Sequence, residues 1–191
     1  MPAFCLSARI GIGPDCRQRR HRRATTGMLR SDAMKRLLIV YHTQFGGTAQ
    51  MAEAAGGGAR EIEDVDTVLK RAADAGVDDV LRCNALLIAT SENFGSLSGM
   101  VKDFLERVYY PCEGRIEGKP YSVLVCASND GAGAMLQTDR IATGLRLRKV
   151  HPGTIYKSGL IAQAHVVPQA TLRICAEIGA TLAAGLAGGI Y

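Results

Sequence analysis

A short loop at 42–48, with the sequence HTQFGGT, groups residue types that bind phosphate. It follows the apolar run 37–41 and precedes a stretch with helical character. Its hydroxyl and amide groups can donate hydrogen bonds to phosphate oxygens, and its glycines let backbone N–H groups approach closely. A helix beginning near Thr48 adds unpaired N–H groups and about half a positive charge. The residues suited to a phosphate are Thr43, Gln44, Gly46, Gly47 and Thr48, and 37–59 contains no Lys or Arg.

Two better known phosphate loops do not occur in this sequence. The Walker pattern requires a Lys after its glycines, and none follows Gly47, so hydrolysis of ATP or GTP of that type is not expected. The pattern G-x-G-x-x-G is also missing, and the GIG at 11–13 has no strand before it. Taken alone, the loop is equally consistent with a plain strand-to-helix turn in which Thr48 is the N-cap.

Two further loops carry similar residues after apolar runs, TSENFGSLSG at 90–99 and ASNDGAGA at 127–134. Phe94 and nearby backbone amides can meet a flat heteroaromatic ring, although the core or a partner subunit can also cover an aromatic side chain there. Glu92 can accept a hydrogen bond from a ring N–H or stay solvated. Asp130 can be a helix N-cap without a ligand role. A structural turn can explain one such loop, but three loops of this kind favour a ligand site.

Apolar runs that alternate with helical stretches predict the elements that position these loops. The expected strands are 37–41, 64–70, 85–90, 121–127 and 153–162, and the expected helices are 48–61, 98–109, 132–148 and 169–186. Continuously apolar strands indicate a sheet covered on both faces. Alternating strands and helices predict an α/β fold with three layers and a doubly wound five-stranded parallel sheet. Because phosphate-type residues follow the first strand, the expected strand order is 2-1-3-4-5. The loops after strands 1, 3 and 4 then share one edge.

The formal net charge of +5 belongs to the first residues of the chain. Residues 1–33 carry seven Arg and two Asp, whereas 34–191 carry 16 basic and 16 acidic residues. We interpret 1–33 as a disordered or misassigned leader, because Met34 opens the natural start MKRLLIVYHTQ; an organellar transit segment is the alternative. The domain at 34–191 is neutral, which does not favour a nucleic-acid partner.

The six cysteines are scattered, with no C-x-x-C pair and no zinc-type spacing, so no metal site is expected. Cys83 and Cys126 lie in or beside apolar runs and are interpreted as small core residues. The scattered spacing of the cysteines indicates a reducing, cytoplasmic location. The apolar C-terminal stretch is interrupted by Arg173 and Glu177, so it predicts an amphipathic helix packed on the sheet rather than a membrane span.

The three loops together resemble those of the flavodoxin-like flavoproteins, most closely the NAD(P)H-dependent FMN and quinone reductase branch. IVYHTQFGGTAQMAEA is similar to the first strand and phosphate loop of that family, ATSENFGSLSGMVKDFLER to its ring-binding loop, and LVCASNDGAGA to its third loop. The resemblance covers about 34–187, with the three motifs in the expected order. Departures include Phe45, Gly47, Ser91 and Glu92, where the family often has other residues.

The resemblance implies FMN as the cofactor and NADPH or NADH as the electron donor. It implies a phosphate site at Thr43, Gln44, Phe45, Gly46, Gly47 and Thr48, and a ring site at Ser91, Glu92, Asn93, Phe94 and Gly95. It also implies that the other edge of the ring contacts Ser128, Asn129, Asp130 and Gly131. Because the flavin carries the redox chemistry, no protein side chain is expected to be catalytic, and His42, His151 and His165 are given no role.

Three functions are compatible with these residues. The first is an oxidoreductase that uses NAD(P)H to reduce a quinone, a flavin or a similar small acceptor, as a homodimer or homotetramer. The second is a flavodoxin-type electron carrier; such carriers are strongly acidic for docking on basic partners, and the neutral charge of 34–191 argues against this. The third is a domain that has lost its cofactor and only mediates interactions, which the change at Ser91 keeps open.

Overall fold

The computed structural model describes residues 34–159 and 166–191. The predicted leader at 1–33, His165 and the last residues of the predicted strand 153–162 lie outside this part. The strands are β1 (Lys35–Tyr41), β2 (Val65–Arg71), β3 (Ala85–Asn93), β4 (Ser96–Leu97), β5 (Pro120–Ala127), β6 (Arg148–Lys149) and β7 (Thr154–Lys157). The helices are α1 (Gly47–Arg60), α2 (Val77–Arg82), α3 (Gly99–Cys112), α4 (Ala132–Gly144) and α5 (Gln169–Ala187).

The main sheet is parallel, with the order β2-β1-β3-β5 followed by β6 and β7, which both pair with β5. β1 lies between β2 and β3 and pairs in parallel with each. The predicted order 2-1-3-4-5 is confirmed, since β6 and β7 together fill the fifth position. The loops that follow β1, β3 and β5 consequently lie at the same edge of the sheet.

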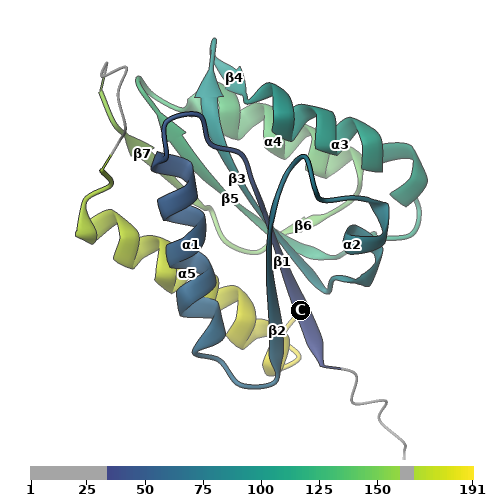
Figure 1. Cartoon of the computed structure of the whole chain (residues 1–191). Coiled ribbons are helices and arrows are strands. Elements are labelled where there is room, and N and C mark those ends of the chain that lie inside the picture. The colour runs from purple at the N-terminus through teal and green to yellow at the C-terminus, as the bar shows by residue number, and fades with distance from the viewer. Residues whose placement is uncertain (1–33, 160–165) are drawn as a thin grey trace, which may run out of the picture. The chain divides into compact units, whose positions relative to one another are not determined.

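Side chains of each central strand alternate between two apolar clusters, one on each face of the sheet. On β1, Leu38 and Val40 belong to the cluster covered by α2, α3 and α4, whereas Leu37 and Ile39 belong to the cluster covered by α1 and α5. All four side chains are fully buried. Figure 1 shows the two groups of helices on opposite faces of the sheet. The three-layer prediction is confirmed.

The structure differs from the predicted elements in three places. α2 was not predicted, because six residues are too few to show helical periodicity. β3 continues to Asn93 because it turns back and pairs with β4 in an antiparallel hairpin. The predicted helix 132–148 ends at Gly144, since Arg148 and Lys149 join the edge of the sheet beside β5.

Helix α5 is the one helix in the described residues long and apolar enough to cross a membrane by length and composition. Its apolar face includes Cys175, Ile178 and Leu182, which are buried in the same cluster as α1. The core helix of a globular domain passes the same test of length and composition. The packing of α5 agrees with the predicted amphipathic helix.

The backbones of α1 and α5 lie in direct contact. A Cβ atom at Gly58 would clash with the carbonyl oxygen of Ala176, and one at Gly179 would clash with the carbonyl oxygen of Ala55. Glycine at these positions therefore lets the helices approach more closely than side chains would allow. This contact fixes α1 on the sheet, with its N-terminus at the edge where the three loops meet.

We predict that Gly58→Ala lowers the free energy of unfolding by about 2–3 kcal/mol, because the added methyl group overpacks the α1–α5 contact. Gly57→Ala is the matched control, since a Cβ there meets nothing within 4 Å. That variant should gain about 0.5–1 kcal/mol from reduced backbone entropy in the unfolded chain. Urea unfolding measures both variants, and equal effects would contradict the close contact.

Candidate functional site

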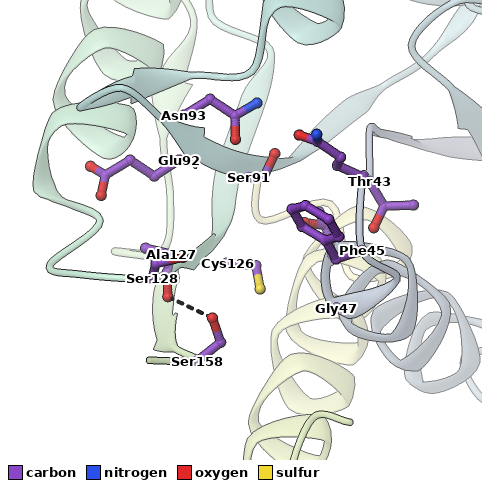
Figure 2. A pocket seen from close by; sticks show the side chains of 12 residues that line it. Thr43, Phe45, Gly47, Ser91, Glu92, Asn93, Cys126, Ala127, Ser128 and Ser158 are labelled. Carbon is purple, nitrogen blue, oxygen red and sulfur yellow. Dashed lines mark hydrogen bonds between the residues drawn. The ribbon is translucent and has the colours of Figure 1, made fainter. Parts of the chain in front are cut away.

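A pocket opens beyond the carboxyl ends of β1, β3 and β5, with about 340 Å³ of empty space when its open mouth is included. Figure 2 shows side chains from all three loops around it. The lining residues are Thr43, Gln44, Phe45, Gly47, Thr48, Ser91, Glu92, Asn93, Cys126, Ala127, Ser128 and Ser158. The structure thus brings the three predicted loops to one place, at the point where the strand order reverses.

The first loop, 42–48, leads into the N-terminus of α1. Gly46 is the N-cap with a left-handed φ of 87°, and its N–H donates to Oγ1 of Thr43 at 2.9 Å. The alternative in which Thr48 is the N-cap is wrong: Thr48 lies inside the helix and is buried. No side chain caps α1, and its first turn contains no acidic residue. The N–H groups of that turn therefore remain available to an anion.

The floor of the pocket contains residues that the sequence analysis did not assign to the site. Cys126 and Ala127 end β5, and Ser158 follows β7, where its hydroxyl lies 3.1 Å from the carbonyl oxygen of Ala127. Burial raises the pKa of the Cys126 thiol, while a hydrogen bond with Thr48 acts in the opposite direction. The thiol is therefore protonated at neutral pH. Ser158 was missed because the expected strand 153–162 included it, whereas β7 ends at Lys157.

Ser91 has a hydroxyl oxygen that is buried and has no hydrogen-bond partner within the described chain. The residue lines the pocket at the end of β3, next to its paired residue Cys126 on β5 (Figure 2). Leaving a buried hydroxyl unpaired costs about 1–3 kcal/mol. A polar ligand in the pocket would remove this cost, so the donor set fits a ring that carries hydrogen-bonding atoms.

Glu92 borders the pocket but its carboxylate is engaged elsewhere. Its two oxygens accept hydrogen bonds from the N–H groups of Gly131 at 3.1 Å and Ala134 at 3.3 Å, at the start of α4. Figure 2 shows the side chain directed away from Phe45. Both alternatives considered for this residue, a bond to a ring N–H and a solvated carboxylate, differ from the contacts found here.

Phe94 and Gly95 form the two-residue turn between β3 and β4 and do not line the pocket. Both have positive φ angles, 54° and 70°, which are the signs of a type I′ turn. The Phe94 side chain is fully exposed, at 108% relative accessibility. Neither the core nor a ring covers it in this chain alone, and its backbone conformation is uncommon for a bulky residue.

The third loop contributes Ser128 to the pocket, whereas Asn129, Asp130 and Gly131 do not line it. Asp130 accepts a hydrogen bond from the N–H of Ala132 at 2.8 Å, and Gly131 is the N-cap of α4 with a φ of 74°. The alternative in which Asp130 is the N-cap is therefore wrong, although its carboxylate makes a local contact at the start of α4. The other three residues lie next to the start of α4 and outside the pocket wall. This loop therefore contributes less to the pocket than the sequence predicted.

The described histidines do not enter the pocket. Burial, and then the nearby Arg71, lower the pKa of His42, which keeps its imidazole neutral at pH 7. His151 accepts a hydrogen bond from the N–H of Gly153 through Nδ1 at 3.0 Å. Within the described residues, no group of three His, Cys, Asp or Glu side chains could hold a metal ion.

We predict opposite effects of Ser91→Ala on folding and on ligand binding. Removing the unpaired hydroxyl should raise the free energy of unfolding of the flavin-free protein by about 1 kcal/mol. It should also weaken the binding of added FMN about tenfold, because one polar partner is lost. The two quantities are measured by urea unfolding and by fluorescence titration.

Thr67→Val is the matched control, because the Thr67 hydroxyl on β2 is also buried without a partner but lies outside the pocket. It should stabilise the protein without changing FMN affinity. A Ser91→Ala variant that is destabilised without ligand, or that binds FMN as the original chain does, would contradict the assignment.

We also predict that Phe94→Asn raises the free energy of unfolding relative to Phe94→Ala by about 1 kcal/mol. Both variants remove the exposed ring, but Asn accepts a left-handed backbone at lower cost, and Asn-Gly is the preferred type I′ pair. Thermal or urea unfolding of the two variants checks this. Equal stabilities would mean that the hairpin turn has a different backbone conformation in solution.

Known proteins resemble this chain in sequence and in fold. Residues 39–155 match the family model described as flavodoxin. A protein of Aquifex aeolicus named flavodoxin is 33% identical over 100 residues, which cover 52% of each chain. A protein of Acidithiobacillus ferrooxidans named NAD(P)H dehydrogenase (quinone) is 29% identical over 121 residues, covering 52% of this chain and 60% of that one. The chain thus spans roughly half to three fifths of the length of these relatives.

Solved structures share the fold. A flavodoxin from the domain Archaea has a TM-score of 0.67 at 18% identity, covering 80% of this chain and 99% of that one. A WrbA-like flavodoxin from Agrobacterium tumefaciens has a TM-score of 0.64 at 17% identity, covering 81% and 98% of the two chains. The family model covers more than half of the sequence, and the solved structures share the fold. The chain belongs to the flavodoxin family.

Proposed function

We propose that this protein binds FMN in the three-loop pocket and acts as an NAD(P)H-dependent oxidoreductase on a quinone, a flavin or a similar small acceptor. The observation that carries the proposal is the convergence of all three loops on one pocket that borders the uncapped N-terminus of α1. When bound, FMN supplies the hydride and electron transfer chemistry. The protein's task is then to hold, orient and shield the cofactor.

The phosphate end of the site is assigned to the first loop. The Thr43 hydroxyl accepts from the Gly46 N–H and keeps its own hydrogen free to donate. The first-turn N–H groups of α1 supply further donors, and the helix dipole favours a negative charge. In the part of the chain that the structure describes, no Lys or Arg lines the pocket. These groups suit one phosphate held by neutral donors.

The ring end is assigned to the second and third loops. Ser91 offers an unpaired hydroxyl, and Asn93 and Ser128 add polar groups on the same wall. Phe45 lines the opposite side and gives the pocket an aromatic surface. The buried Cys126 and Ala127 form a floor that excludes water from below. Such a wall is polar along one edge and apolar on its face, as a flat heteroaromatic ring requires.

Two relatives support the enzymatic part of the proposal. The proteins of Acidithiobacillus ferrooxidans and Geobacter sulfurreducens are named NAD(P)H dehydrogenase (quinone) and are 29% and 25% identical to this chain over their matched parts. The equal numbers of acidic and basic residues in 34–191 also differ from the acidic surface expected of a carrier. We therefore favour turnover of a small acceptor, with NADH or NADPH as the donor.

An electron carrier is the second candidate, because the Aquifex aeolicus relative is named flavodoxin. A carrier binds FMN in the same pocket but passes electrons to a protein partner. We further propose a cytoplasmic location, supported by the four unpaired cysteines of the described chain, and a homodimer or homotetramer in which a partner subunit covers the exposed Phe94.

The proposal predicts that the purified full chain binds FMN with one site per chain and turns yellow. With FMN bound, it should oxidise NADH or NADPH in the presence of a quinone. A chain that binds no FMN would overturn the proposal. A yellow protein that leaves both nicotinamides unoxidised would instead support the carrier.

Variants of Thr43 show whether the cofactor occupies the assigned site. Thr43→Val removes the hydroxyl that braces Gly46 and should weaken FMN binding about tenfold. Thr43→Ser keeps the hydroxyl and should remain within about twofold of the original affinity. Equal affinities for all three proteins would place the phosphate elsewhere.

A further inference from the structure

Glu92 ties the second loop to the third. It lies at the end of β3, pairs with Leu97 across the β3–β4 hairpin, and accepts hydrogen bonds from the N–H groups of Gly131 and Ala134. The first of these N–H groups belongs to the N-cap Gly131 and the second to the first turn of α4, where the local carboxylate of Asp130 accepts the N–H of Ala132. A carboxylate from a distant strand therefore serves as the cap of this helix.

Two further contacts join the hairpin to α4. The hydroxyl of Ser96 lies 3.2 Å from Oε1 of Gln137, one helical turn beyond Gly133. At Gly133 itself, an added Cβ would clash with the carbonyl oxygen of Gly95, so the two backbones touch. With Glu92, these contacts hold the hairpin against the first two turns of α4. The pocket wall formed by Ser91 and Asn93 depends on where this hairpin lies.

The contact also sets the charge of the site. Two helix N-termini, those of α1 and α4, lie at the sheet edge that carries the pocket. The first is uncapped, whereas the second carries the Glu92 carboxylate. A helix N-terminus alone contributes about half a positive charge, so a full negative charge there reverses its sign. Since no Lys or Arg lines the pocket, Glu92 is the one charged side chain on its wall among the described residues.

We propose that Glu92 is a positioning residue that fixes the β3–β4 hairpin on α4 and makes the ring end of the pocket electronegative. The charge disfavours the reduced flavin, which carries an additional negative charge at neutral pH, relative to the oxidised flavin. The charge therefore lowers the reduction potential of the bound flavin, which makes its reduced form a stronger electron donor. The effect on the flavin rests on the proposed function, whereas the tie between the loops does not.

The first part of the test uses the flavin-free full chain and its Glu92→Gln variant. Gln has nearly the same size, keeps one acceptor oxygen and removes the charge. Amide hydrogen exchange measured by NMR should be about tenfold faster at Gly131 and Ala134 in the variant. The amides of Asn93 and Ser96, which pair across the hairpin turn, should also exchange faster because the hairpin loosens.

Asp130→Asn is the matched control. It removes a carboxylate from the same helix end, but Asp130 contacts only the neighbouring Ala132 N–H and is exposed. Exchange should increase at Ala132 and remain unchanged in the hairpin. Unchanged exchange at Gly131 and Ala134 in Glu92→Gln, or a hairpin unaffected by that variant, would overturn the positioning role.

The second part measures the affinities of oxidised and reduced FMN. In Glu92→Gln the affinity for reduced FMN, relative to that for oxidised FMN, should rise about tenfold. This corresponds to an increase of about 30 mV in the two-electron reduction potential of the bound flavin. Asp130→Asn should change this ratio by less than about twofold, because its charge is screened by solvent. Equal ratios in the two variants would overturn the effect of charge.

The two parts separate the inference from the proposed function. If the original chain binds no FMN, the proposed function is wrong and the charge effect falls with it. The exchange measurements still decide whether Glu92 ties the hairpin to α4, since they involve no flavin.

Discussion

The parallel pairing of β1 with both β2 and β3 is the constraint on which the rest of the structure depends. The chain leaves β1 through α1 on one face of the sheet and leaves β3, after the short strand β4, through α3 on the other. The loops after β1 and β3 therefore diverge, and the crevice between them cannot be closed by either helix. The pocket follows from this topology rather than from any single side chain. The glycine contact between α1 and α5 then fixes the wall on the α1 side.

The proposed phosphate site contains no cationic side chain among the described residues. The N-terminus of α1 is left uncapped and faces the pocket, while that of α4 is occupied by Glu92. One helix end is therefore available to a ligand and the other is used to hold two loops together. This difference between the two helix ends favours a ligand with one phosphate and an uncharged ring. The groups expected to bind the phosphate are therefore distinct from Glu92, which positions the second and third loops. The unpaired Ser91 hydroxyl lies between the two regions.

Much of the fold could be predicted from the sequence, because buried parallel strands leave continuous apolar runs. Those runs gave the order of the central strands and the common edge of the three loops. α2 and β4 were not predictable in this way, since six and two residues carry no clear period. Within the site, the residues chosen from the first loop line the pocket except for Gly46, which is the N-cap of α1. Glu92 and Asp130 were harder, because a carboxylate that caps a helix and one that meets a ligand look alike in sequence.

In the proposed function, the uncapped end of α1 receives the phosphate of a flavin mononucleotide. The most direct measurement compares the affinities of FMN and riboflavin, which differ only in the phosphate, by fluorescence titration of the full chain. Several charge-assisted hydrogen bonds to the phosphate should make FMN bind at least about 100-fold more tightly. Equal affinities for the two flavins would contradict the account, because the ring alone would then supply the binding energy.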